Sequence, residues 1–342
     1  MSELENRLSK ISIVYGDIFK MPVDILILKY ADAFRGADLR AAEILGISNK
    51  ISLSRGEHRS FRSNERIAAP LICFVGVGRL GDFRYQQIRE FGRNVPTIAK
   101  VVQPGARQLA ITIHGPGYGL DEREAVFALF AGIIEAGQPT ERFDSKADIS
   151  IIIVEKDKKR YGRIQGYLDE FLKFFAGQLW DQRLSFGRDD AAFRGQFEKD
   201  TLELMQFGAV SEEKPHVFVA MPFAKEYIDE WELGLREPVN ELGFLCERMD
   251  AEVYTGDVLQ HIKRRIESCN VLLAILTGDN PNVYLEIGYA WGKGIPTVLV
   301  VREGHKVRFD VQGQRHLTYE SVYDLRKKIK TELEDLRKRR LI

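Results

Sequence analysis

Short apolar segments alternate with amphipathic segments along the first half of this 342-residue chain. Apolar, β-branched segments lie at residues 11–15, 24–28, 71–77, 109–114 and 149–154, and segments with a helical period lie at 37–45, 84–100, 121–136 and 161–175. Strands that alternate with helices predict an α/β layer fold with a largely parallel sheet. Residues 47–66 break the pattern, and we interpret them as a hairpin or a surface loop.

The same alternation returns in the second half of the chain. Strands are predicted at 216–220, 244–249, 271–276 and 297–301, and helices at 224–242, 257–269 and 285–293. A charged amphipathic helix is predicted from residue 321 to the end. We therefore expect two three-layer α/β domains, the first with a mixed sheet and the second with a flavodoxin-like parallel sheet. The predicted divisions are 1–176, a helical connector at 177–213, a second domain at 214–325 and a charged C-terminal helix at 326–342.

Charge and composition exclude several classes of protein. Lysine plus arginine and aspartate plus glutamate both number 50, so the net charge favours neither nucleic acid nor an anionic membrane as a partner. No apolar segment approaches the length of a membrane span, and the charged N-terminus is unlike a signal peptide. Cys73, Cys246 and Cys269 lie in or beside apolar segments and lack metal-ligand spacing, which predicts buried thiols. We expect a cytoplasmic protein that has no metal site.

A carboxylate, Glu286, stands between the apolar segment 271–276 and the apolar positions of the next helix. Parallel sheets bind ligands beyond the carboxyl ends of their strands, and the loop at 277–283 lies at such an end. We expect Glu286 in the first helical turn, where the helix dipole favours the anionic form. The residue pattern alone leaves two interpretations open, an ordinary first-turn acid or a catalytic carboxylate.

A resemblance to a known superfamily bears on this choice. The run LTGDNPNVYLEIGYAWGKGIPTVLV from residue 276, preceded by HVFVAMPF at 216–223 and followed by VRFDVQGQRHLTY at 307–319, resembles the superfamily of TIR-like domains and nucleoside 2-deoxyribosyltransferases. The resemblance covers roughly residues 214–325. It implies that Glu286 acts at the anomeric carbon of an N-glycosidic bond, where an oxocarbenium-like centre develops positive charge.

Further substrate contacts are predicted around Glu286. Asp279 and Asn282 are candidates to contact ribose hydroxyls, and the resemblance implies one acidic or amide contact that spacing does not assign between Asp279 and Asn280. Asp257 is either a helix N-cap or a substrate contact. Two further residues are expected either to line the base pocket or simply to pack, namely Pro222 and Phe223.

The first domain contains a glycine-rich loop between a strand and a helix. Gly115, Gly117 and Gly119 would let the backbone approach a phosphate, and a tight turn is the alternative explanation for them. With GDI at 16–18, VDILIL at 23–28 and the segment at 149–172, the loop resembles a macro domain, and CFVGVGRLGDFRYQQIREFGRNV at 73–95 is similar to the variant that begins leucine aminopeptidases.

The macro-domain resemblance implies a nucleotide ligand for the first domain. Asp17 would face the adenine, and the remaining predicted contacts are Gly36, Gly115, Gly117, Tyr118 and Gly119. ADP-ribose-hydrolysing members carry an asparagine-rich stretch where this chain reads LKYADAFRGADL at 28–39. We therefore expect a binding or regulatory domain, with a purely structural role as the alternative.

Three functions remain open from the sequence. The first is an N-glycosidase that cleaves NAD or a related nucleotide, needs no cofactor, is controlled by an ADP-ribose-like or cyclic nucleotide, and serves as an anti-phage or stress effector. The second is a nucleoside or nucleotide 2-deoxyribosyltransferase or hydrolase of salvage, acting on deoxynucleosides. The third is a non-catalytic nucleotide sensor. By analogy with TIR-type enzymes we expect a homo-oligomer.

Overall fold

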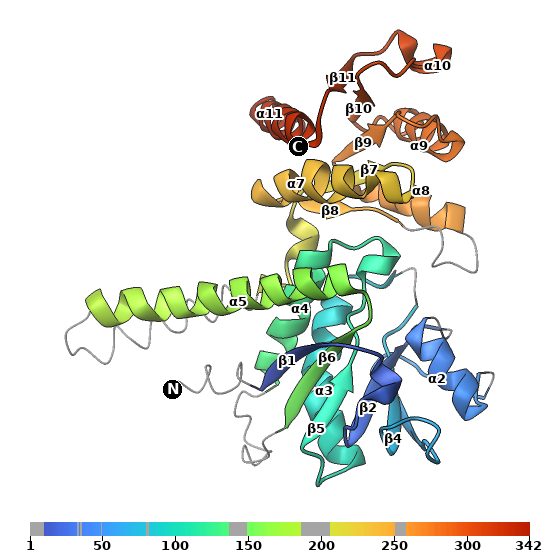
Figure 1. Cartoon of the computed structure of the whole chain (residues 1–342), viewed down its shortest axis with the longest axis vertical. Helices are drawn as coiled ribbons and strands as arrows, with labels where there is room; N and C mark the ends of the chain where they lie inside the picture. Colours follow the sequence, from blue (N-terminus) through green and yellow to red (C-terminus); the bar gives the residue numbers. More distant parts are fainter. Residues whose placement is uncertain are drawn as a thin grey trace. The chain divides into compact units, whose positions relative to one another are not determined.

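The computed structural model describes residues 10–32, 34, 36–48, 50–79, 82–136, 149–185, 206–249 and 258–342 (Figure 1). The chain divides into two compact units. Unit 1 comprises Met1–Gly115 and Glu122–Ser211, and unit 2 comprises Pro116–Asp121 and Glu212–Ile342. No described helix combines the length and apolar character needed to cross a membrane.

Unit 1 is built on a six-stranded sheet in the order β1-β6-β5-β2-β4-β3. All neighbouring strands are parallel except β3, which runs antiparallel to β4 and lies in the segment interpreted as a hairpin or a loop. The strands are β1 (Ile11–Tyr15), β2 (Ile25–Tyr30), β3 (His58–Arg62), β4 (Leu71–Gly76), β5 (Gln108–Ile111) and β6 (Ser150–Glu155). The helices are η1 (Ile18–Lys20), α2 (Ala37–Leu45), α3 (Tyr85–Val102), α4 (Glu122–Glu135) and α5 (Lys158–Ser185).

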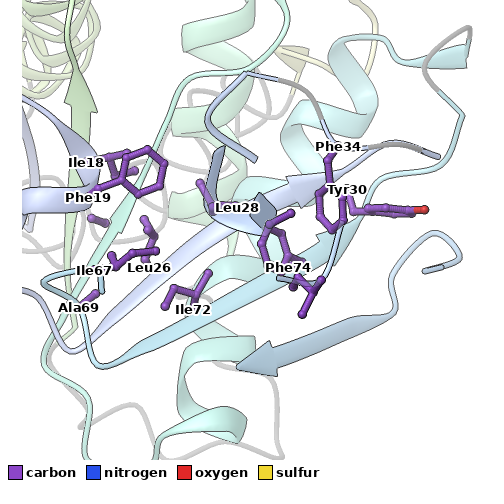
Figure 2. Close-up of a cluster of buried hydrophobic side chains, with 14 of the residues drawn as sticks. Ile18, Phe19, Leu26, Leu28, Tyr30, Phe34, Ile67, Ala69, Ile72 and Phe74 are labelled. Carbon is purple, nitrogen blue, oxygen red and sulfur yellow. The ribbon is translucent and has the colours of Figure 1, made fainter. Parts of the chain in front are cut away.

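One face of this sheet carries a core of aliphatic and aromatic side chains (Figure 2). Alternate side chains of β2 and β4, including Leu28 and Phe74, meet the small residues of α2. The ring of Phe34 packs edge-on against Tyr30 and Phe74, with ring centroids 5.0 Å apart in both pairs. Both strands are buried along nearly their whole length, which explains why continuous apolar segments located them in the sequence.

The helices α3 and α4 of unit 1 approach each other closely because glycines lie at their contact. A Cβ atom added to Gly132 would lie 2.0 Å from the carbonyl oxygen of Arg89, and one added to Gly92 would lie 2.5 Å from that of Leu129. Backbone atoms cannot yield as a flexible side chain can, so the two glycines fix the separation of the helices.

We predict that Gly132→Ala destabilises the protein, because its methyl group would overlap the α3 backbone. The expected loss is about 1–3 kcal/mol in the free energy of unfolding. Gly162→Ala is the matched control, since Gly162 is an exposed glycine in α5 with open space around its Cβ position. The control should be neutral or up to about 1 kcal/mol stabilising through helix propensity. Equal effects in chemical denaturation would show that the α3–α4 contact tolerates a side chain.

Unit 2 is a fully parallel five-stranded sheet in the order β8-β7-β9-β10-β11, the order of flavodoxin-like doubly wound folds. The strands are β7 (His216–Ala220), β8 (Leu245–Glu247), β9 (Val271–Ile275), β10 (Thr297–Arg302) and β11 (His316–Tyr319). The longer helices are α8 (Val258–Ser268), α9 (Pro281–Gly292) and α11 (Val322–Lys338), with short helices η3 (Pro116–Tyr118), η4 (Ser211–Glu213) and α10 (Phe309–Gln312). The mixed sheet of unit 1 and the parallel sheet of unit 2 confirm the predicted α/β class.

Both faces of the unit 2 sheet are buried. Val271, Leu273 and Ile275 of β9 pack with α11 and the helical segment after β7, which form one core cluster. Leu272 and Ala274 of the same strand pack with α8 and α9 in a second cluster. Because α11 contributes four buried side chains to the first cluster, the charged C-terminal helix is part of this core.

The prediction of one continuous helix at 224–242 is wrong, because the structure has three shorter helical segments there. These are η5 (Lys225–Tyr227), the π-helical segment η6 (Glu230–Arg236) and α7 (Glu237–Glu241). Pro238 at the start of α7 lacks an N–H group, which interrupts the regular hydrogen bonding. Wide π turns are commonly found at functional sites.

Candidate functional site

The strand order of unit 2 creates one topological switch point. From β7 the chain moves to β8 on one side, and β9 lies on the other side, so the loops after β7 and β9 diverge at the carboxyl edge. Pro222 and Phe223 follow β7, and Gly278 to Asn280 follow β9. The structure therefore brings these predicted substrate contacts to the same edge of one sheet.

The loop after β9 approaches the segment after β7 closely at Gly278. Gly278 has φ +90°, and a Cβ atom there would lie 2.4 Å from the hydroxyl of Tyr227 and 3.7 Å from the ring of Pro222. A glycine is thus required both by the left-handed backbone and by the contact with Tyr227. Tyr227 was not predicted, because no sequence spacing links η5 to a loop fifty residues later.

Asp279 is fixed in the left-handed region, with φ 51°. Its Oδ1 accepts a hydrogen bond from the Tyr284 hydroxyl at 2.9 Å and lies 3.2 Å from Nε of Arg308. His305 Nε2 lies 3.6 Å from the same oxygen. Burial acts to raise the pKa of Asp279, but the Tyr284 hydrogen bond and the Arg308 charge lower it on balance. The role of Asp279 toward a ribose stays a prediction.

The helix that carries Glu286 begins earlier than the sequence predicted. Asn280 is the N-cap, its side chain accepts a hydrogen bond from the N–H of Asn282 at 2.9 Å, and Pro281 is the first helical residue. Proline suits that position because its missing N–H has no partner there anyway. Asn282 therefore lies in the first turn of α9, exposed to solvent.

The prediction that Glu286 lies in the first turn is wrong, because the start at Pro281 places it in the second turn. The favourable effect of the helix dipole fades beyond the first turn. Burial is the sole cause of the shift in its pKa, which rises from an ordinary value of 4.5 to about 8. Among the residues that the structure describes, none gives its carboxyl group a hydrogen bond or an ion pair.

A second carboxylate at this edge, Glu230, is paired. It is 2% exposed at the start of η6, and Oε1 lies 3.3 Å from the guanidinium of Arg302. The Tyr319 hydroxyl lies 3.5 Å from the same oxygen, and Thr277 Oγ1 accepts from the N–H of Arg302. This cluster ties η6 to the ends of β10 and β11. Sequence analysis did not find it, because its members come from separate segments.

Asp257 lies outside the described residues, so its predicted contact is not located. Within the described part of the chain, no group of three histidine, cysteine or acidic side chains could hold a metal ion. Cys73, Cys246 and Cys269 are free and buried, as the sequence predicted.

In unit 1, Asp17 and Gly36 both adjoin the start of α2. Asp17 caps η1 by accepting from the N–H of Phe19, and it lies 3.6 Å from the guanidinium of Arg40. Gly36 is the N-cap of α2 with φ 57°, and its carbonyl accepts from the N–H of Arg40. These contacts support local structure, and the adenine contact of Asp17 stays a prediction.

The residues of the predicted glycine loop belong to two different units of the structure. Gly115, with φ 111°, groups with unit 1, whereas Gly117, Tyr118 and Gly119 group with unit 2. Gly117 and Tyr118 form the short helix η3, and Gly119 has φ 86°. The positive φ angles confirm that glycine is structurally required at 115 and 119. Phosphate binding by the loop stays a prediction.

A buried ion pair of unit 1 was not predicted. Lys29 at the end of β2 lies 2.7 Å from Asp38 of α2, and both side chains are almost wholly buried. Burial raises the pKa of Asp38 more than the charge and hydrogen bond of Lys29 lower it.

Comparison with known proteins gives distant structural likenesses. No family model matches the chain, and no curated protein matches it significantly. A macrodomain of Trypanosoma brucei in complex with ADP is similar at 14% identity and TM-score 0.39, over 48% of this chain and 72% of that one. The macrodomain of Thermus aquaticus DarG is similar at 12% identity and TM-score 0.32, over 42% and 97%. The CMP N-glycosidase BcmB of Clostridium botulinum is similar at 19% identity and TM-score 0.29, over 34% and 98%.

Two of these structures are macrodomains, the kind of domain that the first half of the sequence resembles. At such low scores none of the three assigns a family or an activity to this chain. The resemblance of the second half to TIR-like domains and deoxyribosyltransferases stays a prediction.

We predict that Gly278→Ala destabilises unit 2, because the methyl group meets the Tyr227 hydroxyl and the backbone has positive φ. The expected loss is about 1–3 kcal/mol in the free energy of unfolding. Tyr227→Phe in the same chain removes the closest atom and should recover part of this loss. A double-mutant cycle in urea measures the coupling. Strictly additive effects would show that the two residues do not touch.

We predict that Glu286→Gln stabilises the protein increasingly as the pH rises. Because the folded pKa is about 8 and the ordinary value is 4.5, the folded state holds a proton between these values that the unfolded chain has released. Stability of the wild type therefore falls as the pH rises through this window, and the full cost is present above it. Glutamine has no such cost.

Thermal unfolding at about pH 5 and about pH 8.5 checks this prediction. The melting temperature of Glu286→Gln relative to the wild type should be higher at the second pH than at the first. Glu303→Gln, at an exposed carboxylate, is the control and should show no comparable change. A pH-independent difference at position 286 would contradict the burial of an unpaired carboxyl group.

Proposed function

We propose that unit 2 is an N-glycosidase that cleaves the bond between base and ribose in a nucleotide, with NAD as the first candidate substrate. The observation that carries the proposal is Glu286, a half-buried carboxyl group without a described partner beside the switch point of a parallel sheet. By contrast, two further carboxylates at this edge, Asp279 and Glu230, are paired with arginines.

An unpaired carboxylate suits this reaction because the breaking bond leaves positive charge on the ribose. As the C1′–N bond breaks, the electron pair leaves with the base and the sugar becomes oxocarbenium-like. Glu286 in its ionised form stabilises that charge, and a water molecule then supplies the hydroxyl group at C1′ and releases a proton. Low exposure strengthens the interaction, since less solvent screens it.

The raised pKa favours a substrate that is itself cationic. In the free protein Glu286 is mostly protonated at neutral pH, since its pKa is about 8. A pyridinium ring such as that of NAD brings a positive charge to the site and lowers the pKa of the carboxyl group. A neutral nucleoside offers no such charge, so the salvage reaction is the less favoured of the two catalytic hypotheses.

Unit 1 is proposed to bind a regulatory nucleotide. The support is the resemblance of its sequence to macro domains. In the loop after β5, Gly115 also has a positive φ angle. Assays of unit 2 chemistry are therefore best run with and without ADP-ribose and cyclic nucleotides.

We predict that Glu286→Gln abolishes release of nicotinamide from NAD, by at least about 10³-fold in kcat. The measurement is chromatographic, with purified full-length protein and each activator. Glu303→Gln is the control and should keep wild-type activity. Base release that survives in Glu286→Gln would overturn the catalytic assignment, and wild-type protein that binds NAD without cleaving it would favour the sensor hypothesis.

We also predict the pH dependence of this activity. If the ionised carboxylate acts, kcat/KM should rise with pH and level off above about 8, because kcat/KM reports the free protein. The rise of kcat with pH should occur at lower pH than the rise of kcat/KM, since the bound cationic substrate lowers the pKa of Glu286. Activity that instead falls as the pH rises through 8 would assign Glu286 as a proton donor.

A further inference from the structure

The strand β3 forms one edge of the unit 1 sheet, and its outer side is open. Across the antiparallel pair with β4, the N–H of Gly76 donates to the carbonyl of Glu57 at 2.8 Å. Residues that face the partner strand alternate with residues that face away from it, so every second residue after Glu57 directs its N–H and C=O groups outward. No described residue hydrogen-bonds to these outward groups, which belong to His58, Ser60 and Arg62.

The opposite edge of the same sheet differs, because a side chain already reaches it. The amide of Gln165 in α5 donates to the carbonyl of Ile13 in β1 at 3.1 Å. An open edge can pair with a further strand, and proteins commonly cover or charge such edges. Since no described element covers β3 on its outer side, its side chains determine what can pair with it.

The side chains along this edge are mainly basic. Residues 58–66 read HRSFRSNER and contain three arginines and one histidine against a single carboxylate, that of Glu65. The acid directly before them, Glu57, accepts a hydrogen bond from a backbone N–H of the preceding loop. Neither His58 nor Arg62 forms an ion pair with a described residue. The edge therefore carries a net positive charge.

This charge distinguishes between the strands that could pair with β3. Successive side chains alternate between the two faces, so Arg59 lies on the face of Phe61, with its guanidinium carbon 5.6 Å from the ring centroid, and Arg62 lies on the other face. A second copy of β3 would bring arginines near arginines, and like charges across a strand pair are destabilising. An acidic strand would meet opposite charges on both faces.

We propose that β3 is a docking edge for an extended acidic segment of a partner protein, which adds to the unit 1 sheet as a further strand. The outward N–H and C=O groups would supply main-chain hydrogen bonds, and Arg59 and Arg62 would select acidic side chains. The site is independent of the proposed glycosidase, because all of its residues belong to unit 1.

The test uses full-length protein and a fluorescein-labelled peptide in which glutamate alternates with threonine. Fluorescence anisotropy at low ionic strength should show saturable binding with a Kd below about 1 mM, at least about 10-fold tighter than for a peptide with lysine in place of glutamate. The double variant Arg59→Glu/Arg62→Glu should weaken this binding at least about 10-fold. Lys158→Glu/Lys159→Glu, at two exposed lysines of α5, is the matched control and should bind as the wild type does.

The variant Ser60→Pro separates strand addition from simple charge attraction. Because the N–H of Ser60 points away from β4, proline keeps the β3–β4 hydrogen bonds and removes only a donor to the added strand. The variant should keep the wild-type melting temperature and bind the peptide about 10-fold more weakly. A peptide with proline in place of threonine keeps its charge but cannot form a strand, so it should bind the wild type equally weakly.

Three results would overturn the proposal. The first is equal binding of the threonine and proline peptides, which would decide the matter even if Ser60→Pro did not fold. The second is the absence of saturable binding by the glutamate–threonine peptide. The third is a single-stranded oligonucleotide of equal charge that binds as tightly as the peptide and is unaffected by Ser60→Pro, which would assign the edge to nucleic acid.

Discussion

Burial of both faces of the unit 2 sheet is the constraint on which the rest of that unit depends. Successive residues of β9 pack into opposite core clusters, so every connection between its parallel strands must cross a face as a helix. All carboxyl ends then share one edge. The strand order places β7 between β8 and β9, and the loops at this edge become the place where side chains from remote segments meet.

The sequence predicts those features that neighbouring residues determine, and it fails for those that depend on contacts between remote segments. The strand at 216–220 was located with its correct bounds, because its largely apolar sequence lies between Pro215 and Pro222. The start of α9 was misplaced, because Asn280-Pro281 is typical both of a turn and of a capped helix start. Periodicity did not show the broken helix at 225–241, since its apolar residues keep a helical spacing through the π turn.

Candidate site residues follow the same division. Glu286 was found because its carboxyl group interrupts an apolar context in the sequence itself. The partners of Asp279 and Glu230 were not found, because Arg308, Arg302 and Tyr319 reach them from separate segments of the chain. The stacking of Arg248 on Trp231 was not found either, because it depends on how η6 lies beside the end of β8.

The charges at the carboxyl edge of the unit 2 sheet argue for a substrate that carries a positive charge. Asp279 and Glu230 are paired with arginines, whereas Glu286 has no described cation to stabilise its ionised form. A nucleotide with a cationic base would supply that charge. A neutral nucleoside would leave the cost of burying the Glu286 carboxylate without compensation.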